Sequence, residues 1–213
     1  MKFASAVYLI VPTLLSTASA AHSRLDKENA VGLFKIVQDY HPTQFRNNML
    51  AHAAVGKLFT LPTILTTSAE TGPNGPLPNE ILDLHPNAPL VQRNGEVNAW
   101  DNPEFRAAVE ATGKKQIILA GITTDVCTVF LALSLRDAGY DVWANSEASG
   151  TFDERVAADA NGRMRDAGVH LVSTFAVIMD LMRDWRNTPG AEQLLPFIDR
   201  YACFSVVDSF PQE

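Results

Sequence analysis

From about residue 42 onward, the sequence alternates between short runs of apolar residues and longer stretches with helical periodicity. The short runs, several of them rich in β-branched residues, predict strands at residues 62–67, 116–122, 140–144 and 169–173. The longer stretches predict helices at residues 43–60, 102–112, 124–138, 153–167 and from 174 to about 187. Repeated strand–helix units of this kind form a parallel sheet with helices on both faces. The expected fold class is therefore α/β, a three-layer α/β/α doubly wound parallel sheet.

One strand is missing from this pattern. The helix at residue 43 should follow a central strand, but the available run, VGLFKIV at residues 31–37, contains Lys35. A strand buried on both faces should not carry a lysine, so the first strand is expected to be incomplete or missing. Such a gap leaves backbone groups unpaired in the core, at about 1–3 kcal/mol each. The apolar segment at residues 7–11 is an alternative occupant of this position.

The same N-terminal segment has the features of a secretory signal peptide. Lys2 precedes an apolar stretch at residues 6–15, and small residues follow at 18–20. The stretch is too short to span a bilayer, which needs about 20 residues. We therefore expect a signal peptide at residues 1–20, a mature domain at 21–190 and a tail at 191–213. The expected localisation is secreted if the signal is cleaved and cytoplasmic otherwise, and cleavage would exclude the strand at residues 7–11.

Composition narrows the function classes. The 213 residues include 17 Lys+Arg and 24 Asp+Glu, which gives a formal charge of −7. This negative charge argues against a nucleic-acid-binding protein, which requires a basic face. Two cysteines, Cys127 and Cys203, are too few for a disulfide scaffold, although they can pair in an oxidising compartment. We expect neither a nucleic-acid nor a membrane partner. The residues beyond Pro189 have no clear period and are expected to pack loosely or to form an oligomer contact.

Cys127 is the candidate nucleophile. It lies five residues after the predicted strand at 116–122, in the first turn of the next predicted helix. Ligands of open parallel sheets bind beyond the carboxyl ends of the strands. Exposed backbone N–H groups at a helix start also favour the thiolate form of a cysteine. The alternative is a buried structural cysteine, which is common in protein cores.

Five strings, in order along residues 24–190, resemble the isochorismatase-like cysteine hydrolase family. GITTDVC at residues 121–127, followed by an apolar helix, resembles the nucleophile motif of that family. Four further strings resemble the branch typified by YcaC: TILTTSAETGPNGP at 63–76, NAWDN at 98–102, ASGTF at 148–152 and DWRN at 184–187. The resemblance implies a doubly wound α/β fold, a homo-oligomer, and hydrolysis of a small carbonyl or amide compound without a cofactor. The site it implies contains an aspartate, a basic residue and a cysteine.

The matching strings also imply individual roles. Cys127 is the nucleophile, and Arg93 occupies the place of the basic residue, where a guanidinium can stabilise a thiolate but cannot deprotonate a thiol. The alternative for Arg93 is a loop residue with its head in solvent. The peptide bond between Thr123 and Thr124 corresponds to a cis bond of the family, which would help to form an oxyanion hole with nearby amides. Substrate-binding residues are expected in two of the strings: Glu70, Asn98 and Trp100.

The family's aspartate has no counterpart at the expected place. In the family it ends the first strand, in a string like apolar-apolar-Val-Asp-x-Gln, whereas here residues 26–31 run directly into GLFK at 32–35. About eight residues are missing, the length of a strand with its Asp turn. Loss of a general base removes about 10²–10⁴-fold of rate. Asp39 follows an apolar run and is a possible substitute, although a solvated acid near a helix start is the simpler interpretation.

One short string has the spacing of a metal-binding motif. Asp39-Tyr40-His41 has the Asp-x-His spacing of a related amidase branch, with His52 and His85 as conceivable further ligands. A single Asp-x-His is common by chance, and neither histidine lies in a ligand-like string. No metal is therefore expected.

Three interpretations remain open on the sequence. The first is a cysteine hydrolase, which predicts an accessible Cys127 thiol that is unusually reactive near neutral pH. The second is a catalytically inactive member of the family with a binding or assembly role. The third is a truncated gene model that has lost one strand. The sequence leaves the substrate and the oligomer size unspecified.

Overall fold

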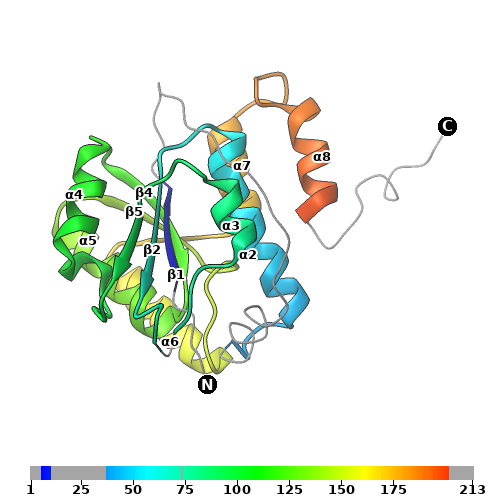
Figure 1. Cartoon of the computed structure of the whole chain (residues 1–213). Helices are drawn as coiled ribbons and strands as arrows, with labels where there is room; N and C mark the ends of the chain where they lie inside the picture. Colours follow the sequence, from blue (N-terminus) through cyan, green and yellow to red (C-terminus); the bar gives the residue numbers. More distant parts are fainter. Residues whose placement is uncertain (1–5, 11–36, 73, 202–213) are drawn as a thin grey trace.

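The computed structural model describes residues 6–10, 37–72 and 74–201. A six-stranded sheet in the order β3-β2-β1-β4-β5-β6 forms the centre of the molecule (Figure 1). Its strands are β1 (Ala6–Ile10), β2 (Thr63–Ser68), β3 (Leu90–Arg93), β4 (Gln116–Gly121), β5 (Asp141–Asn145) and β6 (His170–Val172). Three of its neighbouring pairs are parallel: β2 with β3, β4 with β5, and β5 with β6. The three-layer α/β/α fold is thus confirmed.

The central position of the sheet is occupied by the N-terminal segment. β1 lies between β2 and β4 and is antiparallel to both, with Tyr8 opposite Leu65 on one side and Ala120 on the other. The sheet is therefore mixed and not all-parallel, and its central position is filled by the segment expected as the alternative occupant. An antiparallel strand satisfies the backbone groups of both neighbours as well as a parallel one does. The sequence allowed this segment to be either a cleaved signal peptide or a strand of the sheet, and in the structure it forms the strand.

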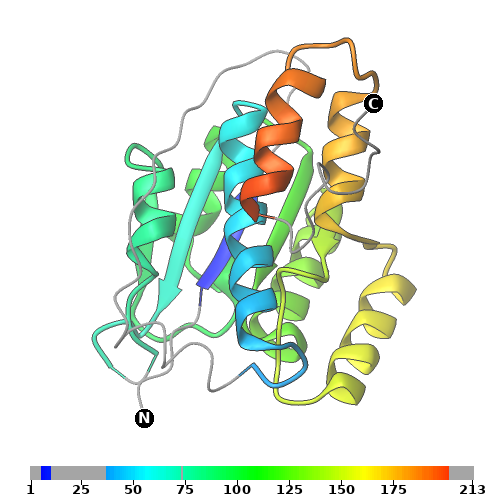
Figure 2. The same ribbon diagram turned by 90° about the vertical axis from the view of Figure 1, so that its right-hand side faces the viewer.

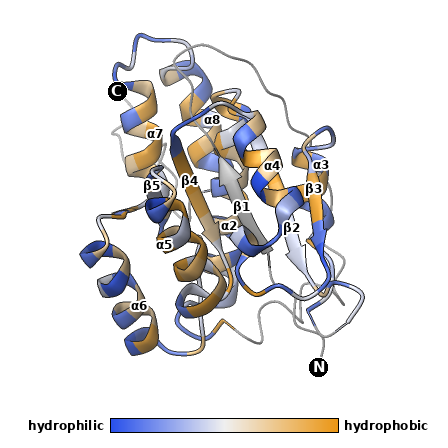
Figure 3. Ribbon diagram, turned by 90° about the vertical axis from the view of Figure 1, so that its left-hand side faces the viewer, coloured by the Kyte–Doolittle hydropathy of each residue, from blue (hydrophilic) through white to orange (hydrophobic). Residues whose placement is uncertain are grey.

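Helices cover both faces of the sheet. On one face, α2 (Pro42–Leu58) contacts α3 (Asn79–Leu84), α7 (Thr174–Met182) and α8 (Ala191–Tyr201). Figure 2 shows α2, α7 and α8 in front of the sheet. On the other face, visible in Figure 3, lie α4 (Pro103–Ala111), α5 (Val129–Asp137) and α6 (Glu154–Asp166). No helix among the described residues is long and apolar enough to cross a membrane.

Buried side chains fill both interfaces between helices and sheet. On the α2 face, Phe45 and Ile81 are fully buried, and the carboxylate of the buried Glu80 forms a 2.6 Å ion pair with Arg46 between α2 and α3. On the α4–α5 face, Phe105 and Leu131 are fully buried in a cluster that also contains Cys127. The candidate nucleophile is therefore part of the packed layer between the sheet and these helices.

Side-chain caps mark the beginning of several helices. The side chains of Asn102 and Asp153 accept hydrogen bonds from Phe105 N and Arg155 N, at 3.0 and 2.9 Å, and so begin α4 and α6. The next helix, α7, begins at Thr174, because the side chain of Ser173 accepts a hydrogen bond from Ala176 N. That helix ends at Met182 and not near residue 187, since Arg183 adopts a left-handed φ of 63°.

Residues 191–201 belong to the region that was expected to pack loosely or to form an oligomer contact, and in the structure they pack on the α2 face. They form α8, whose buried residues Leu194, Ile198 and Tyr201 lie at spacings of four and three. Ile198 and Tyr201 line the cavity between α2 and α7, and Pro196 lies inside the helix. The region predicted to be a tail thus contributes one element of the α2 face.

Candidate active site

The candidate site lies at the carboxyl ends of the parallel strands. Arg93 is the last residue of β3, and Cys127 belongs to a π-helical turn, η2 (Thr124–Thr128), that follows β4 directly. The sequence predicted an ordinary α-helix from residue 124; the α-helix α5 begins only at Val129. The amides of Val126 and Thr128 both donate to the carbonyl of Thr123, at 3.3 and 3.1 Å, and so close the turn.

Because β1 runs antiparallel to its neighbours, its first residue, and not its last, lies at the strand ends where Cys127 is found. Ala6 lies opposite Thr67 and Val7 opposite Gly121, so β1 begins at the edge where Cys127 lies. Ile10, the last residue of β1, lies opposite Thr63 and Ile118, towards the other edge. A carboxylate following this strand would therefore point away from the candidate site, unlike one that ends a parallel first strand.

Cys127 is buried, with 7% of its surface exposed. The expectation of an accessible thiol is thus wrong, because the turn packs against the apolar cluster between the sheet and α4 and α5. Cys203, the possible disulfide partner of Cys127, lies outside the described residues.

Arg93 is a buried cation, with 1% of its surface exposed, and not a solvated loop residue. Its Nε donates to Thr66 Oγ1 at 3.0 Å, and its Nη1 donates to the carbonyls of Glu96 and Val97. Burial lowers the pKa of Arg93 below its usual range, and attraction to Cys127 and Glu96 partly offsets this shift. Its buried Nη2 has no hydrogen-bond partner among the described residues. A charged donor is therefore left available within electrostatic range of Cys127.

The three predicted binding residues hold the neighbouring loops in place. Glu70 accepts hydrogen bonds from Thr67 Oγ1 at 2.7 Å and from Gln92 Nε2, and so joins the ends of β2 and β3. Asn98 caps the short 3-10 helix η1 (Ala99–Asp101) by accepting from Trp100 N at 3.1 Å, and it donates to Ser134 Oγ on α5 at 2.9 Å. The Trp100 ring makes an edge contact with Tyr140, with 5.7 Å between centroids.

The loop after Arg93 is stabilised by Glu96. Hydrogen bonds from its own backbone amide and from the Asn102 side chain hold the pKa of Glu96 at about 2. The carbonyl of Glu96 accepts from Ser68 Oγ at 3.0 Å as well as from Arg93. Sequence reasoning missed Glu96, and its only signal was its position three residues after Arg93.

The predicted cis peptide bond is displaced by one residue. The cis bond joins Ile122 and Thr123, not Thr123 and Thr124. The Thr124 amide donates to the Gly150 carbonyl at 3.1 Å, because the bridge between Ile122 and Gly150 brings that carbonyl close. This amide is therefore occupied and is not a free oxyanion donor.

Asp39, the possible substitute base, is tied to the loop after β5. Its Oδ1 accepts from the Thr151 amide at 2.9 Å, and its half-buried carboxyl group has a pKa raised mainly by desolvation. The charges that act on it are those of Glu154 and Asp125. Asp39 thus serves as an anchor for Thr151 in this structure.

The residues considered for a metal do not converge. No group of three or more His, Cys, Asp or Glu side chains in the described part of the chain is arranged to hold a metal ion. His41 is the exposed N-cap of α2, His52 contacts Asn145, and His85 contacts the carbonyl of Ala53 at 2.8 Å.

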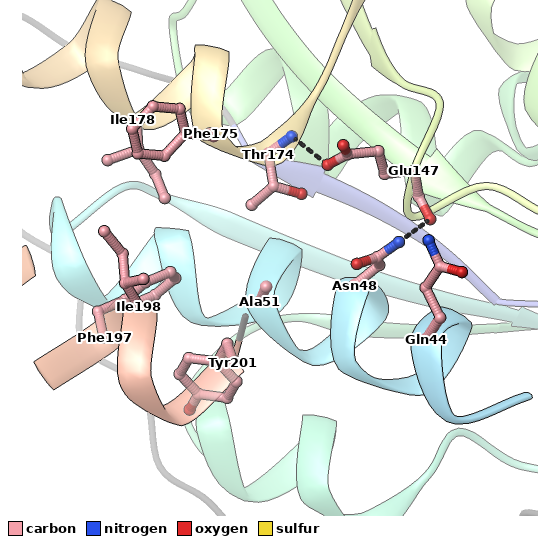
Figure 4. Close-up of a pocket in the computed structure, with 10 residues that line it drawn as sticks. All are labelled: Gln44, Asn48, Ala51, Glu147, Thr174, Phe175, Ile178, Phe197, Ile198 and Tyr201. Atoms are coloured by element: carbon pink, nitrogen blue, oxygen red, sulfur yellow. Dashed lines mark hydrogen bonds between the residues drawn. The ribbon is translucent and has the colours of Figure 1, made fainter. Parts of the chain in front are cut away.

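A separate cavity of about 230 Å³ lies on the other side of the sheet, between α2, α7 and α8. Figure 4 shows polar side chains at one end and apolar ones at the other. Glu147 lies at the polar end, where its side chain accepts from Thr174 N at 2.9 Å and its carbonyl accepts from Asn48 Nδ2 at 3.2 Å. None of the predicted site residues lines this cavity.

A doubly wound α/β sheet with helices on both faces is the fold of the isochorismatase-like hydrolases. The model of the isochorismatase domain matches residues 38–176, and the chain belongs to this family.

Two relatives, one of them compared both by sequence and by structure, share most of its length. The probable hydrolase YcaC of Escherichia coli is 49% identical over 172 residues, 77% of this chain and 83% of that protein. A structure of YcaC from Pseudomonas aeruginosa, with hexane-2,5-diol and covalent acrylamide, is 46% identical over 79% of this chain and 82% of that one, with a TM-score of 0.77. The structure of Escherichia coli YcaC, described as an octameric hydrolase of unknown specificity, is 42% identical over 90% of this chain and 92% of that one, also with a TM-score of 0.77.

Proposed function

We propose that this protein is a cysteine hydrolase that acts on a small carbonyl or amide compound, with Cys127 as nucleophile. The observation that carries the proposal is the placement of Cys127 within electrostatic range of Arg93, a buried cation whose Nη2 has no hydrogen-bond partner among the described residues. A guanidinium stays charged even when buried, so it stabilises an adjacent thiolate or the oxyanion formed from a carbonyl.

This arrangement supports a two-step hydrolysis through a thioester. The sulfur of Cys127 attacks the carbonyl carbon, the leaving amine or alcohol departs with a proton, and a thioester with the enzyme remains. Water then attacks the thioester, releases the acid and restores the thiol. Arg93 cannot accept the thiol proton, so solvent or a substrate group takes it. A slower rate than that of an enzyme with a positioned base is therefore expected.

The relatives support both the chemistry and the assembly. YcaC from Pseudomonas aeruginosa carries covalent acrylamide, an electrophile that reacts with thiols. YcaC from Escherichia coli is octameric. We propose that this chain also forms a homo-oligomer and that its substrate is a small molecule.

A second candidate function is a binding or assembly role without turnover. The observation that favours it is the direction of β1, which places the end of the central strand away from Cys127. A protein of this kind keeps the fold and the oligomer, while its thiol reacts no faster than that of a free cysteine.

Alkylation of Cys127 separates the two candidates. The full-length protein is treated with acrylamide between pH 6 and 9, and the modified cysteine is identified by peptide mass, with Cys127→Ser as the control. Faster modification at pH 7 than that of free cysteine supports the hydrolase. A rate equal to or below that of free cysteine over the whole pH range favours the second candidate.

Replacement of the cation tests the role of Arg93. We expect Arg93→Met to lower the alkylation rate of Cys127 at pH 7 by about 10–100-fold, the equivalent of one lost charge-assisted interaction of about 1.5–3 kcal/mol. Arg93→Lys keeps a positive charge and should retain a larger part of the rate. Circular dichroism establishes that both variants are folded. Equal rates for Arg93→Met and the unchanged protein would show that Arg93 does not act on the thiol.

A further inference from the structure

The loop that follows β5, residues 145–151, is held by hydrogen bonds along its length. At its start, Asn145 Nδ2 donates to Thr174 Oγ1 at 2.8 Å, and Glu147 is bound to α2 and α7 (Figure 4). In its middle, Ser149 Oγ donates to the Asn145 carbonyl at 2.8 Å and accepts from the Gly121 amide at 3.3 Å. The loop is therefore a rigid connection between the α2 face and the end of β4.

The far end of this loop contacts the turn that carries Cys127. The Gly150 carbonyl accepts from the Thr124 amide at 3.1 Å. Thr151 Oγ1 donates to Asp125 Oδ1 at 2.5 Å, and Asp125 lies two residues before Cys127 within η2. Space at this contact is tight, since a Cβ at Gly150 would lie 2.6 Å from a methyl group of Val37.

Thr151 uses all its polar groups in this arrangement. Its amide donates to Asp39 Oδ1 at 2.9 Å, and its carbonyl accepts from the amides of Gln38 and Asp39 at 2.8 and 3.3 Å. Its hydroxyl is left to bind Asp125, and the residue is fully buried. Because the backbone of Thr151 is fixed on both sides, its hydroxyl can hold the turn in one position.

We propose that Thr151 is a positioning residue that acts through Asp125 to hold the Cys127 turn in its reactive geometry. This role rests on the proposed function of Cys127. The bond joins a hydroxyl donor on the loop, Thr151, to a carboxylate acceptor on the turn, Asp125. The two residues are 26 positions apart in the sequence. Without this bond, the turn keeps its backbone hydrogen bonds and its apolar packing, but no side-chain bond ties it to Thr151 and the sulfur is less well placed.

The test compares substitutions that remove or keep the bond. Acrylamide alkylation of Cys127 at pH 7 is measured in the full-length protein with Thr151→Val, which removes the hydroxyl, and with Thr151→Ser, which keeps it. We expect a fall of about tenfold for Thr151→Val, the effect of a loss of about 1.4 kcal/mol. Thr151→Ser should stay within about twofold of the unchanged protein.

The other side of the bond gives an independent comparison. Asp125→Ala removes the acceptor from a partly exposed position and should lower the rate as Thr151→Val does, whereas Asp125→Asn keeps an oxygen acceptor and should retain most of it. Ile81→Val, which removes one buried methyl group from α3 in a cluster without Cys127, controls for a general loss of stability and should not change the rate.

The outcomes separate this role from the proposed function. If Cys127 of the unchanged protein reacts no faster than free cysteine, the proposed function fails and the role of Thr151 fails with it. If Cys127 reacts rapidly, but Thr151→Val reacts at the same rate or Thr151→Ser falls equally far, the positioning role alone is overturned. Rapid reaction that is lost in Thr151→Val and Asp125→Ala and kept in Thr151→Ser and Asp125→Asn supports it.

Discussion

A chain that lacks residues 1–20 is expected not to fold. The deletion removes β1, which lies opposite five residues of β2 and four of β4 in the middle of the sheet. Each backbone group left unpaired in the core costs about 1–3 kcal/mol, and the total stability of a domain is about 5–15 kcal/mol. The measurement is a urea-unfolding curve followed by circular dichroism, in which the deleted chain should lack a cooperative transition.

Deletion of residues 1–5 is the matched control, since it shortens the N-terminus but keeps Ala6–Ile10. This shorter deletion should unfold cooperatively, with a midpoint close to that of the full chain. The pair of deletions also tests the predicted signal peptide, because cleavage after Ala20 would produce the longer one. If the chain without residues 1–20 unfolds with the same midpoint as the full chain, β1 is dispensable and the segment is free to serve as a signal.

Local patterns were sufficient to predict most elements of the sheet and its helices. The strand at β4 and the helices α4 and α6 follow from apolar runs, caps and terminal glycines that lie within a few residues of each other. β3 was missed because it has four residues and alternates exposed and buried positions at the sheet edge. α8 was missed because Pro196 interrupts the pattern of Leu194, Ile198 and Tyr201.

The site was predictable as a set of residues but not as a geometry. Motif resemblance identified Cys127 and Arg93, yet neither the burial of Arg93 nor the π-helical form of the Cys127 turn is encoded in a local pattern. The contact between Thr151 and Asp125 depends on how two strand ends meet, and so does the use of the Thr124 amide by Gly150. The direction of β1 could not be predicted from the sequence either, because an apolar strand pairs with its neighbours in either a parallel or an antiparallel orientation.

The protein is expected to lose stability between pH 7.5 and 5 because of His52. This residue is buried in α2, where its Nδ1 contacts Asn145 Nδ2 at 3.1 Å. The amide group is a donor, so Nδ1 must accept and the ring must be neutral. Burial, assisted by repulsion from His85, lowers the pKa of His52 to about 3.

The direction of this pH dependence follows from the protons that His52 binds in the folded and unfolded states. The unfolded chain takes up a proton at His52 near pH 6.5, whereas the folded chain does so only near pH 3. Acidification therefore favours the unfolded state, by about 2 kcal/mol between pH 7.5 and 5 and by about 5 kcal/mol once the pH falls below 3. Burial also lowers the pKa of His85, which adds to the loss in the same direction.

Replacement of His52 by glutamine isolates this contribution. His52→Gln keeps an oxygen acceptor for Asn145 but does not titrate, so its free energy of unfolding should fall about 2 kcal/mol less between pH 7.5 and 5. The measurement is a series of urea-unfolding curves across this range, above the pH at which most carboxylates titrate. His41→Gln, at the exposed N-cap of α2, controls for the removal of an imidazole from the same helix. An identical pH dependence for the unchanged protein and His52→Gln would show that His52 is not held neutral by the fold.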